Sequence, residues 1–159
     1  MTRWATMHLG IALVWMFLSG NTTLGGLIAG LLGGFVMMNV FQSALGCGNY
    51  IRRVWAAGIF LGRFLLMIAA SNLRIARAVL RKDAGAIRGE FLSYSVADLT
   101  PFETLLLCQC IGLTPGTIVA ELSADKTTLV LHAFASGTPD EIRHSLDEEL
   151  KHGILAFTR

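Results

Sequence analysis

Residues 1–82 contain no aspartate or glutamate, so about half of this chain has no carboxylate side chain. The same residues include eight basic ones, namely Arg3, Arg52, Arg53, Arg63, Arg74, Arg77, Arg81 and Lys82. Proton and cation relays in membranes use carboxylates or charged pairs placed within the membrane. The composition therefore excludes an ion pump that works by itself.

Other absences exclude catalytic and nucleic-acid-binding functions. The sequence has no phosphate-cradling glycine loop, no serine elbow and no nucleophile next to a base, so we expect neither an enzyme nor a cofactor. The three cysteines, Cys47, Cys108 and Cys110, lack the spacing of zinc or redox pairs and are interpreted as small buried apolar residues. Residues 83–159 hold eleven acids against five bases, a net charge of −6, which would repel nucleic-acid phosphates.

The sequence does contain long hydrophobic segments. A mean hydropathy of +0.59 with 15% charged residues indicates a membrane protein. Residues 4–51 carry no charge and have room for two helices, over about residues 4–18 and 24–41, separated by a polar turn at residues 19–23. Each helix is short for a full crossing, so this hairpin either thins the bilayer or re-enters. It begins like a signal peptide but lacks a cleavage site, and we expect it to be retained.

The second helix of the hairpin has glycines on one face. Gly26, Gly30 and Gly34 are spaced four residues apart, which lets another helix approach closely. The partner is either the other helix of the hairpin or a helix of a different subunit. These glycines are therefore candidate subunit contacts.

A third hydrophobic run covers residues 54–73 and contains a single charge at its centre, Arg63, and its predicted helix continues to residue 81. An arginine at that depth is costly, and no acid of the N-terminal half can neutralise it. Contact with another subunit is the preferred interpretation. Snorkelling to the membrane surface and a place on an ion path are the alternatives.

Basic residues at the end of this run indicate the topology. Arg74, Arg77, Arg81 and Lys82 are candidate lipid anchors, because they suit an anionic membrane surface. By the positive-inside rule they place the C-terminal domain in the cytoplasm, and three spans then place the N-terminus outside. Arg52 and Arg53 would then also lie outside, against the same rule.

Residues 83–159 form a soluble α+β domain with the order βαββα, so the transmembrane region is predicted to be residues 1–82. Strands are predicted at residues 90–96, 117–122 and 127–133. Thr100-Pro101-Phe102-Glu103 and Thr138-Pro139-Asp140-Glu141 are capping boxes that open helices ending near Ile111 and Gly153. The simplest architecture that buries the apolar faces of both helices is an antiparallel sheet with helices on one face, of the ferredoxin-like kind.

The last predicted helix carries three groups capable of binding metal. His144, Glu148 and His152 share one face of this helix. The opposite face carries the apolar residues Ile142, Leu146 and Leu150, so we interpret the face with the histidines as solvated. His8 and His132 are single histidines, and we interpret them as structural.

Three motifs together resemble a known family. The segment Leu113-Thr114-Pro115-Gly116-Thr117 lies between a leucine-rich helix and a β-hairpin. With residues 71–76, Ser-Asn-Leu-Arg-Ile-Ala, and residues 15–20, Trp-x-x-Leu-Ser-Gly, it resembles the E subunits of the multi-subunit Mrp-type (Mnh) sodium/proton antiporters. Residues 108–112, Cys-Gln-Cys-Ile-Gly, depart from that family. Physically, Pro115 and Gly116 suit a turn that connects a helix to a strand.

The resemblance implies an accessory subunit of an antiporter complex in the bacterial plasma membrane, with the other subunits and membrane lipid as its partners. The subunits that move the ions would be the large ones. The alternative hypothesis is a stand-alone membrane sensor whose α+β domain binds a small molecule. It depends on fold analogy alone.

Overall fold

The computed structural model describes residues 2–80, 89–134 and 138–159. The chain forms two compact units, Met1–Trp55 and Ala56–Arg159, and each is described by itself. The division falls inside one long helix, α4 (Gly48–Leu80), which begins six residues before the predicted third run. Part of α4 packs into the core of the second unit. The membrane boundary predicted at residue 82 is a different division and stays a prediction.

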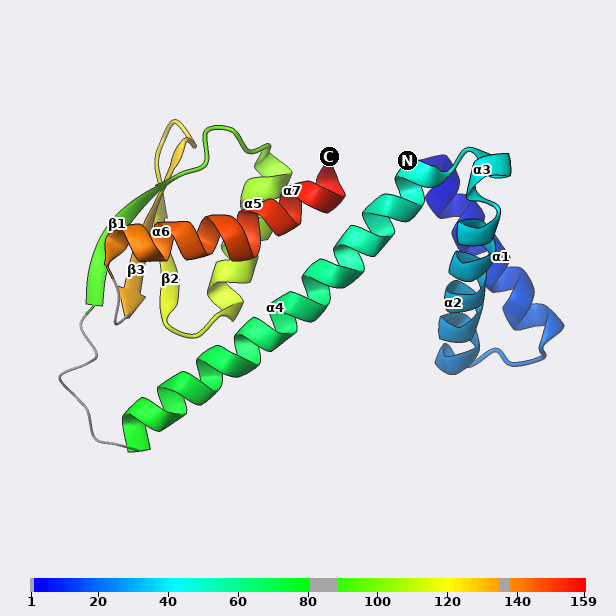
Figure 1. Cartoon of the computed structure of the whole chain (residues 1–159), viewed down its shortest axis with the longest axis horizontal. Helices are drawn as coiled ribbons and strands as arrows, with labels where there is room; N and C mark the ends of the chain where they lie inside the picture. Colours follow the sequence, from blue (N-terminus) through cyan, green and yellow to red (C-terminus); the bar gives the residue numbers. More distant parts are fainter. Residues whose placement is uncertain (1, 81–88, 135–137) are drawn as a thin grey trace. The chain divides into compact units, whose positions relative to one another are not determined.

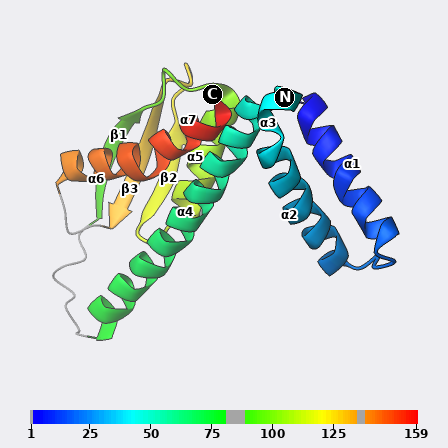
Figure 2. The same ribbon diagram turned by 45° about the vertical axis from the view of Figure 1, so that its right-hand side comes forward.

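The first unit is built on a helical hairpin, as the sequence predicts. Helices α1 (Thr2–Leu18) and α2 (Leu24–Val40) are 17 residues long each and lie side by side (Figures 1 and 2). Gly20 has a φ of +63° in the turn, a conformation that favours glycine. The Thr23 side chain then caps α2 by accepting a hydrogen bond from the Gly26 amide.

The glycine row of α2 faces α1. A side chain at Gly30 would bring its Cβ within 2.6 Å of the Ala12 carbonyl oxygen, and one at Gly26 would overlap the Asn21 backbone. At Gly34, the Cβ would lie 3.1 Å from the His8 ring. Of the two alternative partners, the other helix of the hairpin is thus the one seen in this chain. Contact of these glycines with another subunit stays a prediction.

A short helix, α3 (Gln42–Leu45), leads from the hairpin into α4. Gly46 ends α3 with a φ of +71°. Met38, Cys47 and Ile51 are buried together, and Trp4 of α1 packs against them. The first residues of α1 and α4 therefore meet at one end of the hairpin.

The second unit contains the predicted antiparallel sheet. Its strands are β1 (Gly89–Ser95), β2 (Thr117–Leu122) and β3 (Thr128–Phe134), and β3 lies between the other two. The Asp125 carboxylate accepts hydrogen bonds from Ser123 and Thr127 and so closes the β2–β3 turn. The order βαββα is confirmed. Since a ferredoxin-like sheet has four strands and three are described, the ferredoxin-like topology stays a prediction.

Both predicted capping boxes are present. Thr100 and Glu103 cap helix α5 (Pro101–Leu113), and Thr138 and Glu141 cap helix α6 (Pro139–Ser145). The last helix was expected to end at Gly153, which is wrong. It continues through a π-helical segment, η2 (Leu146–Lys151), into α7 (His152–Thr158).

The π-helical segment has a packing reason. Leu146, Leu150 and Ile154 are all buried, and they are spaced four residues apart. In a regular α-helix such positions drift by about 40° per step, because four residues exceed the 3.6 of one turn. A wider π-helical turn corrects this drift and keeps all three side chains on the sheet.

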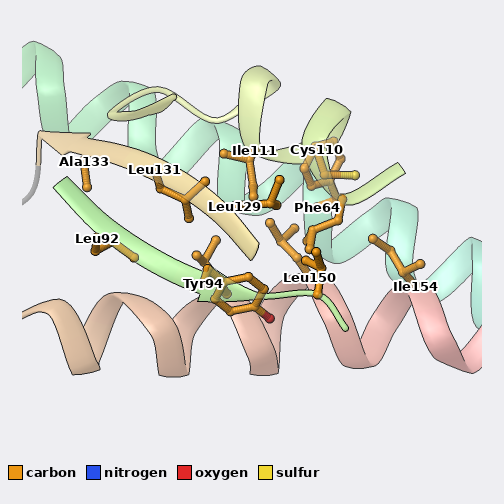
Figure 3. Close-up of a cluster of buried hydrophobic side chains, with 13 residues drawn as sticks. Phe64, Leu92, Tyr94, Cys110, Ile111, Leu129, Leu131, Ala133, Leu150 and Ile154 are labelled. Carbon is orange, nitrogen blue, oxygen red and sulfur yellow. The ribbon is translucent and has the colours of Figure 1, made fainter. Parts of the chain in front are cut away.

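One hydrophobic core joins the elements of the second unit. Leu92 and Tyr94 of β1 and Leu129, Leu131 and Ala133 of β3 point to the same face, where the helices cover them (Figure 3). From α4, Phe64 is buried in this core, and Phe60, Met67 and Ile68 pack against it. The middle of α4 is thus a structural part of the α+β unit.

The hairpin gives a matched pair of substitutions. We expect Gly30→Ala to destabilise the protein, because its methyl group meets the α1 backbone, whereas Gly33→Ala on the same helix meets nothing within 4 Å. An overpacked contact costs about 1–3 kcal/mol. Thermal melting of both variants in detergent measures the difference. Equal melting temperatures would contradict the close α1–α2 packing.

Candidate functional site

A buried histidine joins three helices of the first unit. His8 of α1 is 8% exposed. Its Nε2 lies 2.7 Å from the Leu31 carbonyl oxygen of α2, and its Nδ1 lies 2.7 Å from the Tyr50 hydroxyl of α4. A carbonyl oxygen only accepts, so Nε2 carries a proton and donates it. His8 is therefore structural, as predicted. Its partners are remote in sequence and could not have been named from the sequence.

Arg63 is exposed on α4 in the second unit. Within the residues that the structure describes, its side chain makes no ion pair and no hydrogen bond. Its guanidinium is thus available to a group outside this chain. Contact with another subunit, as the sequence predicts, stays a prediction.

The candidate lipid anchors divide into two pairs. Arg74 and Arg77 are exposed on the last turns of α4. Arg81 and Lys82 lie outside the described residues. The described pair thus continues the basic surface that includes Arg63.

The segment Thr114–Thr117 connects α5 to β2. The Thr114 hydroxyl donates to the Ile111 carbonyl oxygen at 2.7 Å and so closes the end of the helix. Gly116 has a φ of +103°, which disfavours any residue with a side chain, and Thr117 is the first residue of β2. The motif therefore has the predicted connector role, and its contacts are local.

Glu103 of α5 is a buried acidic residue, 2% exposed. Arg159 donates to its carboxylate from two nitrogens, at 3.1 and 3.0 Å. The Thr158 hydroxyl and the Thr100 amide donate to it as well, at 2.8 Å each. The Arg159 hydrogen bonds, followed by that from the Thr100 backbone, hold the Glu103 pKa at about 2.

The sequence identified Glu103 only as a helix cap. Its second role, a buried ion pair with Arg159, joins α5 to the end of α7. A glutamate followed by apolar helical residues is ordinary, so no sequence signal revealed this contact across 56 positions.

The groups considered for metal binding do not form a site. Among the described residues, no three histidine, cysteine, aspartate or glutamate side chains are placed to hold an ion. His152 contacts Glu148, with 3.4 Å between Nδ1 and Oε1, and both side chains are more than half exposed. These side chains are thus exposed, which agrees with the interpretation of the face as solvated.

The cysteines behave as expected from the sequence. Cys47 and Cys110 are buried, Cys108 is partly buried, and all three are free thiols. Burial raises the pKa of the Cys108 and Cys110 thiols, so both stay protonated near neutral pH.

The second unit has a surface depression of about 250 Å³ between the sheet and α6, lined in part by Phe91, Pro139 and Arg143. Small-molecule sites usually enclose about 300–1,000 Å³. The depression is below that range, so it does not favour the sensor hypothesis, which stays a hypothesis.

Comparison with known proteins identifies the chain. The profile of the MNHE family, described as Na+/H+ ion antiporter subunit, matches residues 8–156. Similar proteins include the E1 subunit of the Na+/H+ antiporter of Staphylococcus haemolyticus, 27% identical over 89% of this chain and 91% of the relative. The E subunit of the Bacillus subtilis antiporter is 25% identical over 96% of each chain. A chain of the solved Mrp complex from a Dietzia species covers 62% of this chain and 96% of its own length, with 23% identity and a TM-score of 0.45.

A helical hairpin, a long apolar helix and a small α+β unit define a membrane-associated protein. Its class is that of transporter subunits. The chain belongs to the MNHE family of Na+/H+ ion antiporter subunits, since the family profile covers nearly all of it.

The Glu103 ion pair predicts an acid-dependent loss of stability. Its pKa lies below the ordinary value of 4.5, so the stabilisation is complete above pH 4.5 and is lost as the pH falls toward 2. We expect Glu103→Gln to lower the free energy of unfolding by about 2 kcal/mol at pH 7 and to weaken this pH dependence.

Thermal denaturation between pH 7 and pH 3 checks this expectation. The control is Glu148→Gln, since the Glu148 side chain is 57% exposed. The same pH dependence in wild type and Glu103→Gln would show that the ion pair does not stabilise the fold.

Proposed function

We propose that this chain is a non-catalytic accessory subunit of a multi-subunit Na+/H+ antiporter in the bacterial plasma membrane. The observation that carries this proposal is the match of the family profile to residues 8–156. Curated relatives named as antiporter subunits support it, because they align over about nine tenths or more of both chains.

The composition supports an assembly role over an ion-carrying one. Residues 1–82 have no carboxylate, and the charge within the apolar run of α4 is a cation, Arg63. A binding site for sodium or a relay for protons needs oxygen ligands or titrating groups, which carboxylates normally provide. The ions would therefore pass through other subunits.

The hairpin is proposed to anchor the subunit and to contact its partners. Its outer surface exposes large apolar side chains on both helices, among them Val14 and Phe17 of α1 and Leu32 and Val36 of α2. Such a surface requires lipid or another membrane protein against it. The acidic domain is proposed to lie in the cytoplasm, since the basic residues of α4 favour that side.

Co-purification and transport together test this function. We expect an affinity-tagged chain, extracted in mild detergent, to bring down other antiporter subunits. Deletion of the chain is expected to lower assembled complex and Na+/H+ antiport in everted vesicles by the same factor. The apparent sodium affinity of the remaining complexes is expected to stay unchanged, because the ions do not bind this subunit.

Two substitutions refine the test. Arg63→Ala is compared with Lys126→Ala, an exposed cation in the β2–β3 turn. A loss of assembly in Arg63→Ala alone would place Arg63 at a subunit contact, whereas a change in sodium affinity with normal assembly would oppose the accessory role. A chain that purifies alone, with antiport unaffected by its deletion, would refute the proposed function.

A further inference from the structure

Length and composition alone allow α4 to cross a membrane, because Gly48–Arg77 forms one long apolar stretch. Its packing within the second unit is a separate observation. The Phe60 and Phe64 rings stack 5.8 Å apart, and Phe60 lies 5.5 Å from the Phe157 ring of α7. Any side chain at Gly153 would overlap the Phe60 ring. The centre of the stretch is thus held against the α+β unit.

The α+β unit that shares its core with α4 carries charged pairs. Lys151 of η2 pairs with Asp98 at 2.9 Å, and Glu103 of α5 pairs with Arg159 at 3.0 Å. If residues 60–68 lay in the middle of a bilayer, these ion pairs and the polar sheet would be drawn into hydrocarbon with them. Membranes exclude such charges and exclude open sheet edges. The core contact of Phe64 and a crossing at the same residues are therefore incompatible.

The other sides of α4 suit a membrane surface. Leu61, Leu65, Leu66 and Leu73 are between 50% and 72% exposed, so they are not used by the core. Arg63, Arg74 and Arg77 are exposed and lie on one face, because 11 and 14 residues are close to whole numbers of helical turns. Apolar side chains flanked by a row of arginines are typical of a helix that lies in the headgroup region.

Charge complementarity indicates the kind of lipid. Residues 56–80 of α4 include no acid, and within the described part of the chain none of the three arginines forms an ion pair. Arginine binds phosphate oxygens in a bidentate manner. Anionic phospholipid headgroups supply both the charge and the geometry.

The same arrangement removes a conflict in the topology. Trp4 packs against the cluster of Met38, Cys47 and Ile51, so Arg3 and Arg52 lie at the same end of the hairpin. If the hairpin is the membrane-inserted part and α4 does not cross, Arg52 and Arg53 belong to the same membrane face as Arg63, Arg74 and Arg77. This agrees with the positive-inside rule, which three crossings violate at Arg52 and Arg53.

We infer that residues 56–80 of α4 lie along the cytoplasmic membrane surface, with Arg63, Arg74 and Arg77 on anionic phospholipid headgroups and the neighbouring leucines in the acyl region. This replaces the expected third transmembrane helix, and it assigns Arg63 to lipid in place of the subunit contact preferred from the sequence. It also places the N-terminus in the cytoplasm instead of outside. The orientation does not require the other antiporter subunits, so it can fail or hold independently of the proposed function.

Depth measurements on the full chain test the orientation. Nitroxide labels are placed singly at positions 61, 65 and 73, in a background with Cys47, Cys108 and Cys110 changed to alanine, and the protein is reconstituted in vesicles of phosphatidylglycerol and phosphatidylcholine. Labels at Ile28 and Glu121 serve as membrane and aqueous references. If the cysteine-free background does not fold, a genetically encoded spin-label amino acid replaces it at the same positions.

The two orientations give different depths. A surface helix places all three labels at similar, shallow depth. A spanning helix separates positions 61 and 73 by about 18 Å along the bilayer normal, since each residue rises about 1.5 Å. A depth profile that is greatest near residue 63 would overturn the inference.

Headgroup dependence tests the ligand. We expect the three labels to lose depth and gain mobility in pure phosphatidylcholine, and to do so in phosphatidylglycerol vesicles when Arg63, Arg74 and Arg77 are changed to glutamine. Lys126→Gln is the control and is expected to change nothing. Depths that are insensitive to both lipid and arginine substitution would contradict the binding of anionic headgroups by these arginines.

Discussion

The contact of Phe60 and Phe64 with the α+β core determines what the rest of the chain can do. These rings belong to the helix that most resembles a transmembrane segment, and they are packed against α7 and the sheet. A helix cannot be surrounded by lipid and also form one side of a core whose other elements carry ion pairs. The hydrophobic residues of α4 are therefore divided between two environments, the protein interior and a surface that faces outward.

The hairpin depends on a different constraint, the close approach of two short helices. Gly30 of α2 admits the α1 backbone, and His8 of α1 reaches both the Leu31 carbonyl and the Tyr50 hydroxyl. In lipid, hydrophobic burial does not drive helices together, so small residues and buried hydrogen bonds supply the association. The hairpin thus has its own internal cohesion, which suits an anchor.

Much of the fold could be predicted from local patterns. The helices of the hairpin, the order βαββα and both capping boxes are set by neighbouring residues, through hydrophobic periodicity and the hydrogen bonds of a few side chains. The candidate surfaces were less predictable. The glycine row indicated a partner helix but not which one, since spacing describes one face and not what covers it. The buried Glu103–Arg159 pair and the His8–Tyr50 contact join distant positions and leave no local pattern.

By itself, the sequence determined the class of the protein and the separation of its charges, because hydropathy and charge are properties of composition and order. It also determined where α5 and α6 begin, since their capping boxes are local. Only the tertiary structure decided that the glycines of α2 meet α1, that the last helix needs a π-helical turn, and that α4 shares a core with the sheet. Each of these depends on packing between side chains that lie far apart in the sequence. A local sequence pattern does not indicate such packing.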